Sequence, residues 1–246
     1  MEEVRLDKMD KMSDEIAFLQ GDIKRLLKSV DDDNLPLSQK AYYVMKDLII
    51  TIKLKPGQMI LEREMVAALD MSRTPIREAL VRLELDGWIR IIPRRGFLVS
   101  AIKAEEFEPI FEVVEALDEL AISLATSKAT AQDFERLDSI IRNQAEALKE
   151  NNLLAWVNLD LLFHDKIIDM ANNQRLKRIR EAEYEHLYRL DLYTIKNRTI
   201  PLESLLEHQA IVANMKIRKA EAARIVLRSH RTRVIGEIKD AIELSR

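Results

Sequence analysis

The chain has 246 residues, a net formal charge of −3, 33% charged and only 5% aromatic residues, and no cysteine. This composition excludes disulfides and thiolate metal sites, and it favours a helical protein over a β-sandwich or barrel. No apolar segment approaches the roughly 18 residues of a membrane span, and the charged N-terminus lacks the apolar core of a signal peptide, so we expect a cytoplasmic protein without a membrane partner.

Residues 1–36 are predicted to form an amphipathic helix followed by a polar linker. Apolar residues recur at alternating spacings of three and four, as in a heptad seam, at Met9, Met12, Ile16, Leu19, Ile23, Leu26 and Val30. Two interpretations compete. In the first, the seam pairs two subunits in a short coiled coil. In the second, the helix lies on its own chain, and this stays open because a coiled coil of three heptads is only marginally stable by itself. The acidic residues 31–33 mark the linker, which ends at Pro36.

Residues 37–100 are predicted to form a domain of three helices and a two-stranded hairpin. Helical periodicity, capping residues and Gly or Pro breaks define the helices, and short apolar runs around a turn define the strands. In chain order we expect a helix from Ser38 that ends at the turn Lys55-Pro56-Gly57, a short helix from Leu61, a break at Asp70-Met71, a helix capped by Ser72 or Thr74 and ended by Gly87, and strands at 88–92 and 97–99.

Positive charge is concentrated in this domain. Residues 38–100 contain four Lys and seven Arg against three Asp and four Glu, a net charge of +4 in a chain that is negative overall. Arg73 and Arg77 are four residues apart and therefore share one helix face, and the hairpin turn adds Arg94 and Arg95. A helix-turn-helix presents arginines to the major groove of duplex DNA in this way, and excess positive charge suits a phosphate backbone.

The run SRTPIREALVRLELDGWI, followed by PRRGFLV, resembles the winged-helix reader domain of GntR-type bacterial transcription regulators, over roughly Leu37 to Ser100. The resemblance implies a homodimeric repressor that binds a roughly palindromic operator in double-stranded DNA. It also implies which residues contact DNA: Arg63, Arg73, Thr74, Arg77, Arg94, Arg95 and Gly96. In this interpretation Thr74 meets a phosphate and Gly96 lets the hairpin backbone approach the duplex.

Residues 101–246 are predicted to be helical throughout. We expect six helices, at Glu105–Ser127, Ala131–Lys149, Leu153–Met170, Gln174–Lys196, Glu203–Met215 and Ala220–Leu244. Six helices after such a reader domain resemble the FCD effector domain of the FadR-like branch, which implies a part that dimerises and binds an effector. The predicted fold class is therefore mainly α: an N-terminal winged helix-turn-helix, then an all-α six-helix effector bundle of the FCD type, with an extra N-terminal amphipathic helix.

Three of the four histidines and one aspartate suggest a metal site in this helical part. Asp160 and His164 are four residues apart, so they share one face of a helix. The resemblance to FCD domains implies that Asp160, His164, His208 and His230 bind one divalent metal, and it leaves His186 outside the pattern. Three imidazoles and one carboxylate suit Zn²⁺, Ni²⁺ or Mn²⁺, and these ligand types do not choose among the three.

The resemblance further implies a small-molecule effector that controls DNA affinity, with an organic acid as one candidate. FCD domains of the metal type carry an arginine early in the first effector helix, which can clamp a carboxylate. Here Val114 stands at that position, so this clamp is missing. Arg189 and Tyr193 on the fourth effector helix are the alternative polar contacts that the sequence offers.

A metal-dependent enzyme that uses the Asp/His3 site is the alternative function, because a metal with open coordination positions can polarise a substrate or activate water. The sequence offers no cysteine nucleophile, no serine in a Gly-flanked elbow and no H-E-x-x-H motif to support such chemistry. We therefore expect a regulator rather than an enzyme.

Overall fold

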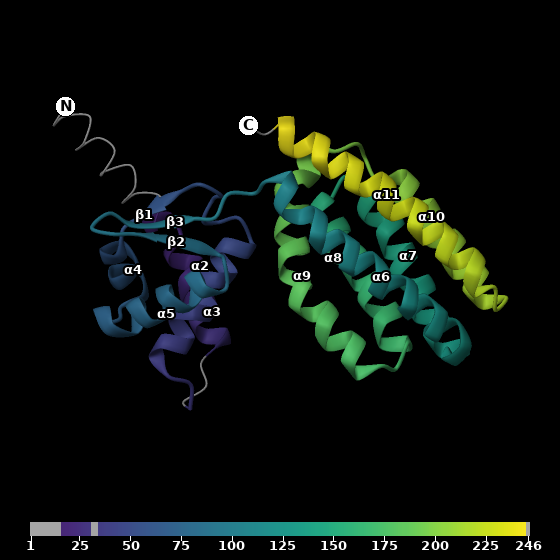
Figure 1. Cartoon of the computed structure of the whole chain (residues 1–246), viewed down its shortest axis with the longest axis horizontal. Coiled ribbons are helices and arrows are strands. Elements are labelled where there is room, and N and C mark those ends of the chain that lie inside the picture. Colours follow the sequence, from purple (N-terminus) through teal and green to yellow (C-terminus); the bar gives the residue numbers. More distant parts are fainter. Residues whose placement is uncertain (1–15, 31–33, 245–246) are drawn as a thin grey trace. The chain divides into compact units, whose positions relative to one another are not determined.

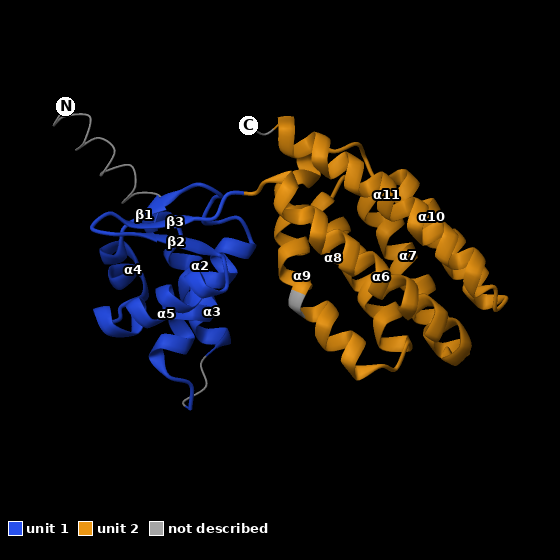
Figure 2. Cartoon of the chain, viewed as in Figure 1, with its two compact units in different colours: residues 1–101 blue, residues 102–246 orange. Residues whose placement is uncertain are grey.

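The computed structural model describes residues 16–30 and 34–244, and the chain divides into two compact units, residues 1–101 and 102–246 (Figures 1 and 2). The mainly helical fold class is confirmed. The first unit contains helices α2 (Gln20–Ser29), α3 (Leu37–Ile50), α4 (Glu62–Leu69) and α5 (Arg73–Leu85), and strands β1 (Met59–Ile60), β2 (Ile89–Ile92) and β3 (Gly96–Val99). The expected hairpin is thus part of a three-stranded antiparallel sheet in the order β1-β3-β2. A two-residue strand such as β1 is too short to show a period in the sequence.

Helices α3, α4 and α5 form the core of the first unit with the sheet. The inward face of α5 is buried through Ile76, Ala79, Leu80 and Leu83, and α5 packs mainly on α3. The break between α4 and α5 is short because Asp70 ends α4 in the left-handed region, with φ 53°. The two helices are therefore joined by a tight turn, and the outward face of α5 stays exposed.

Gly96 at the start of β3 is required by the packing of the sheet. Its φ is +107°, and a Cβ atom there would overlap the backbone carbonyl oxygen of Ile60 on the neighbouring strand β1. Both the positive φ and this overlap disfavour any residue with a side chain at position 96. A close approach inside the protein is thus sufficient to explain the glycine, whether or not the turn also approaches DNA.

Helix α2 packs within its own unit. Ile16, Leu19 and Ile23 of the apolar seam are buried, and α2 contacts α3 and α4. Lys53, just after α3, forms an ion pair with Asp22 at 2.5 Å. These contacts favour the interpretation in which the amphipathic helix lies on its own chain. Met9 and Met12 of the seam lie outside the described residues.

The second unit consists of the six expected helices, with bounds within one or two residues of the prediction. They are α6 (Ala104–Lys128), α7 (Ala131–Lys149), α8 (Leu153–Met170), α9 (Gln174–Thr194), α10 (Leu202–Lys216) and α11 (Ala220–Leu244), with a 3₁₀ turn η1 (Ile195–Asn197) after α9. The polar breaks end in capping residues: Thr130, Asn152 and Asn173 each accept a backbone N–H of the next helix. In the described chain, no helix combines the length and the apolar character that crossing a membrane requires.

Helices α6, α7, α8, α10 and α11 bury a shared apolar core in this unit, to which Leu176 of α9 also belongs. A smaller apolar cluster around Trp156 and Leu161 of α8 adjoins Ile195 of η1. Three buried histidines, from α8, α10 and α11, lie within this unit. Imidazoles in such a place need polar partners, because an unpaired buried polar group is costly.

Candidate nucleic-acid interface and candidate metal centre

An open groove of about 630 Å³ lies in the first unit between the start of α4, the outward face of α5 and the β2–β3 turn. The five arginines predicted for DNA contact all line it: Arg63, Arg73, Arg77, Arg94 and Arg95. All five are exposed. The predicted Gly96 lines the groove too, whereas the predicted Thr74 is exposed at the start of α5 but is not among the lining residues. The groove therefore combines a helix-turn-helix with strong positive charge, as a nucleic-acid surface requires.

Two of these arginines differ in their surroundings. Arg73 is the first residue of α5, where the free N–H groups of the helix end also favour an anion. Arg77 lies one turn further on and donates from Nε to both carboxylate oxygens of Glu62, at 3.0 Å each. Glu62 is the first residue of α4, so this ion pair links the two helices of the helix-turn-helix.

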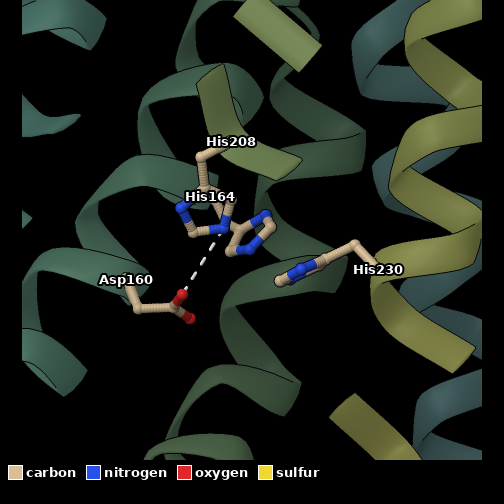
Figure 3. Close-up of side chains that lie close together, drawn as sticks. All are labelled: Asp160, His164, His208 and His230. Carbon is tan, nitrogen blue, oxygen red and sulfur yellow. Dashed lines mark ion pairs between the residues drawn. The ribbon is translucent and has the colours of Figure 1, made fainter. Parts of the chain in front are cut away.

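The four predicted metal ligands come together inside the second unit, where Asp160 and His164 project from α8, His208 from α10 and His230 from α11 (Figure 3). Their ligand atoms lie within 4.8 Å of one another. The Nε2 of His208 is 3.5 Å from Oδ1 of Asp160. Residues from three helices thus surround one point in the bundle.

Two of the imidazoles are oriented by partners outside this group. The Nδ1 of His208 lies 3.1 Å from Oε1 of Gln144 on α7, and the Nδ1 of His230 lies 2.7 Å from Oε2 of Glu207 on α10. Oxygen acceptors at Nδ1 favour the tautomer in which Nδ1 carries the proton and Nε2 keeps its lone pair. Aromatic packing also holds the ring of His208 in place, because Phe163 stacks on it with ring centroids 4.1 Å apart.

Burial sets the charge state of the group. Burial lowers the pKa of His164 and of His208 well below the usual value, and it lowers the pKa of His230 against the opposing effect of Glu207. Burial raises the pKa of the Asp160 carboxyl to about 7. Burial also raises the pKa of the Glu207 carboxyl, but hydrogen bonds from His230 and Arg233 outweigh this effect and lower the pKa to about 2. The imidazoles are therefore neutral, which is the form that binds metals.

The donor set fits a divalent metal ion. The Nε2 atoms of His164 and His208 are buried and have no hydrogen-bond partner among the described residues. A buried nitrogen without a hydrogen-bond partner is costly, and a metal ion would satisfy both. Neutral imidazoles with one carboxylate, backed by oxygen partners, are the arrangement of many Zn²⁺ and related sites.

A small cavity lined by three arginines adjoins this group. Its volume is about 30 Å³, and Asp160, Arg180, Arg198 and Arg231 line it. The Nε of Arg180 donates to Oδ1 of Asp118 at 3.2 Å, and Arg231 donates to the other oxygen of Asp118. Both terminal nitrogens of Arg180 are buried without a hydrogen-bond partner among the described residues. These donors can bind an anion.

The other candidate residues in the second unit lie away from this cavity. Arg189 and Tyr193 are not among the residues that line it, and burial lowers the pKa of Arg189 to about 10. Val114, at the position of the missing arginine, is buried in α6. His186 is half-buried on α9 and outside the metal-ligand group.

Sequence reasoning missed the partners Gln144 and Glu207 and the arginine set. The pattern of α9 could have indicated Arg180, because the cavity-lining residues Arg180, Leu187 and Asp191 recur at spacings of seven and four and therefore share one helix face. Arg189 lies off that stripe.

Known protein families match both parts of the chain. The model of the gntR family of bacterial regulatory proteins matches residues 37–99, and the model of the FCD domain matches residues 109–233. The chain belongs to the GntR family with an FCD domain. Members of this family bind DNA operators and usually act as dimers. The chain is accordingly a DNA-binding transcription regulator, and the winged helix-turn-helix and the FCD bundle expected from the sequence are confirmed.

Individual relatives agree with the GntR assignment. YdhC of Bacillus subtilis, an HTH-type transcriptional regulator, is 26% identical over 86% of this chain and 95% of its own length. The HTH-type transcriptional repressor RspR of Escherichia coli is 23% identical over 84% of this chain and 89% of its own length. The solved structure of E. coli McbR/YncC superposes with a TM-score of 0.68 at 22% identity, over 84% of this chain and 98% of that one. These proteins are regulators, so the enzyme alternative has no support.

Proposed function

We propose that this GntR regulator is a homodimeric repressor in the cytoplasm, which binds a roughly palindromic operator and releases it in response to ligands of its FCD unit. The observation that carries the DNA part is the arginine groove between α5 and the β2–β3 turn. RspR, the similar E. coli protein, is named a repressor. Two copies of α5 matched to successive major grooves would read two half-sites.

The proposed metal ligands are Asp160, His164, His208 and His230. A bound Zn²⁺, Ni²⁺ or Mn²⁺ would supply a Lewis-acid centre that ties α8, α10 and α11 together. The chain's own contribution is to hold each imidazole neutral by burial and to direct the lone pairs of His208 and His230 by the bonds to Gln144 and Glu207. The metal would stabilise the folded unit, because the unfolded chain has no preformed site.

We propose that the arginine-lined cavity holds a small anionic effector beside the metal. Asp118 bonds to both Arg180 and Arg231, and the two terminal nitrogens of Arg180 have no hydrogen-bond partner among the described residues. A divalent ion on Asp160 would add positive charge beside these guanidinium groups. An anion would balance the charge that the metal adds, and the terminal nitrogens of Arg180 offer it a pair of N–H donors. The cavity volume of about 30 Å³ is close to that of one water molecule, so a short dicarboxylate would enter only with an outward movement of the lining side chains.

Effector and operator are coupled in this proposal. A ligand that binds the FCD unit more tightly in one arrangement of the dimer shifts the dimer towards that arrangement. If the spacing of the two α5 helices in this arrangement no longer matches the helical repeat of DNA, the operator is released. Operator DNA must then weaken ligand binding by the same factor by which the ligand weakens DNA binding.

The DNA part is tested by gel shifts on an operator selected from random duplexes. Arg73→Ala should abolish operator binding with unchanged helical content, whereas Arg142→Ala, an exposed change on α7 of the FCD unit, should leave it intact. If Arg73→Ala and Arg77→Ala both bind the operator as the wild type does, the proposed reading surface is wrong.

The ligand part is tested by elemental analysis and calorimetry. Protein purified without chelator should contain about one metal ion per chain, and His208→Ala should lose it while His186→Ala keeps it. Metal-loaded protein should bind succinate more tightly than acetate, and Arg180→Gln should lose this preference while Arg178→Gln, an exposed change on the same helix, retains it. Absence of metal from the purified wild type, even after loading and dialysis, would contradict the metal site.

A further inference from the structure

The ion pair between Glu62 and Arg77 is unusual for its position. Among the described residues that line the groove there are five arginines, and Glu62 is the one acidic side chain. A carboxylate on a surface that approaches phosphates opposes binding to DNA of any sequence. The side chain of Arg77 is 64% exposed, so the pair contributes little to stability. A carboxylate in the first turn of α4 is also favoured by the helix dipole, by about 0.3–1 kcal/mol, so stability explains Glu62 only in small part and general DNA affinity does not explain it.

The geometry of the pair determines which nitrogens of Arg77 are available. Its Nε is 3.0 Å from both oxygens of Glu62, and neither terminal nitrogen makes a hydrogen bond within the described part of the chain. Nε is therefore occupied by Glu62, and the N–H groups of the two Nη atoms remain available on an exposed side chain. Guanine offers O6 and N7 in the major groove to such a pair of N–H donors. Fixing the fork before binding also reduces the ordering cost of a flexible side chain.

We propose that Glu62 is a specificity-determining positioning residue, which holds Arg77 in the orientation that reads one guanine of each half-site at the cost of affinity for DNA in general. This inference rests on the proposed reading surface of α5. It assigns different roles to the two arginines of the helix: Arg77 is held for a base, whereas Arg73 has no such partner in the groove and lies at the helix N-terminus, where phosphate binding is favoured.

The test compares Glu62→Gln with Glu78→Gln, which removes the same charge from an exposed position on α5 next to Arg77. Dissociation constants are measured for the selected operator, for duplexes with one base pair changed at each position, and for unrelated DNA, at several salt concentrations. Both variants should bind unrelated DNA at least as tightly as the wild type. Only Glu62→Gln should lose discrimination, by about tenfold, at a single G·C position of the half-site.

A double-mutant comparison separates positioning from a general effect on the fold. In an Arg77→Ala background, Glu62→Gln should not change discrimination further, because the residue that it positions is gone. Equal discrimination by Glu62→Gln and the wild type at every position would overturn the inference. Failure of the DNA proposal itself looks different, since the wild-type protein would then select no operator.

Discussion

Arg180 and Asp118 form a buried ion pair in the FCD unit, with 3.2 Å between Nε and Oδ1 and side-chain exposures of 2% and 3%. Arg231 bonds to the second oxygen of the same carboxylate, and its side chain is only 10% exposed. One carboxylate therefore bonds to two guanidinium groups, from α9 and α11. In this arrangement Asp118, on α6, joins three helices around the cavity.

Asp118→Asn should destabilise the protein strongly, because it removes the carboxylate to which two buried guanidinium groups bond. We expect a loss of about 3–5 kcal/mol in the free energy of unfolding, measured by urea denaturation of the metal-loaded protein. Asp138→Asn removes an exposed pair with Lys216 and should cost less than about 1 kcal/mol. Similar losses for both variants would show that the buried triad has no special energetic role.

Gln144→Met should weaken metal binding while preserving the packed volume. Methionine fills a similar space but cannot accept a hydrogen bond from Nδ1 of His208, so the ring loses its fixed tautomer and orientation. We expect metal affinity to fall about 10- to 100-fold in a competition with a chromogenic chelator. Gln132→Met, at an exposed site on α7, is the control and should bind metal as the wild type does.

Much of this molecule could be predicted from local patterns. Helix bounds in the FCD unit follow from apolar periodicity and from breaks that end in Thr130, Asn152 and Asn173. The pair Asp160 and His164 follows from a spacing of four on one helix. These features depend on residues close together in the chain, and periodicity reports such neighbours reliably.

Contacts between distant segments were not predictable in the same way. Gln144 meets His208 across 64 positions, and Glu207 bonds to His230 on the next helix rather than to its sequence neighbour. Helical periodicity gives the face on which a polar residue lies but not the residue opposite. The heptad seam shows the same limit, because buried Ile23 identifies an apolar face without saying whether the partner is the same chain or another.

Gly96→Ala should destabilise the first unit even in the absence of DNA. A methyl group there would overlap the carbonyl oxygen of Ile60, and the positive φ adds strain, so we expect a loss of about 2–4 kcal/mol in thermal or urea unfolding. Gly57 also has a positive φ, +75°, but an added Cβ meets nothing within 4 Å, so Gly57→Ala should cost only about 1 kcal/mol. A glycine that serves only the approach to DNA would instead give unchanged stability and weaker binding.

The start of α7 should make a pH-dependent contribution to stability. A hydrogen bond from Lys166, followed by bonds from the backbone and hydroxyl of Thr130, lowers the pKa of Asp133 to about 2. Because the folded pKa lies below the usual range, the contribution of Asp133 is complete above about pH 4 and disappears as the pH falls towards 2. Asp133→Asn should therefore cost about 1 kcal/mol at pH 7.

Urea unfolding of the wild type and of Asp133→Asn at pH 7, 4 and 3 measures this contribution as the difference between the two proteins. The difference should shrink at pH 3, since protonation of the carboxyl in the unfolded wild type then competes with the bonds to Lys166 and Thr130. Glu135→Gln, at an exposed position on the same helix, should show no such trend. A difference that stays constant from pH 7 to 3 would mean that the shape of the cap, rather than its charge, stabilises α7.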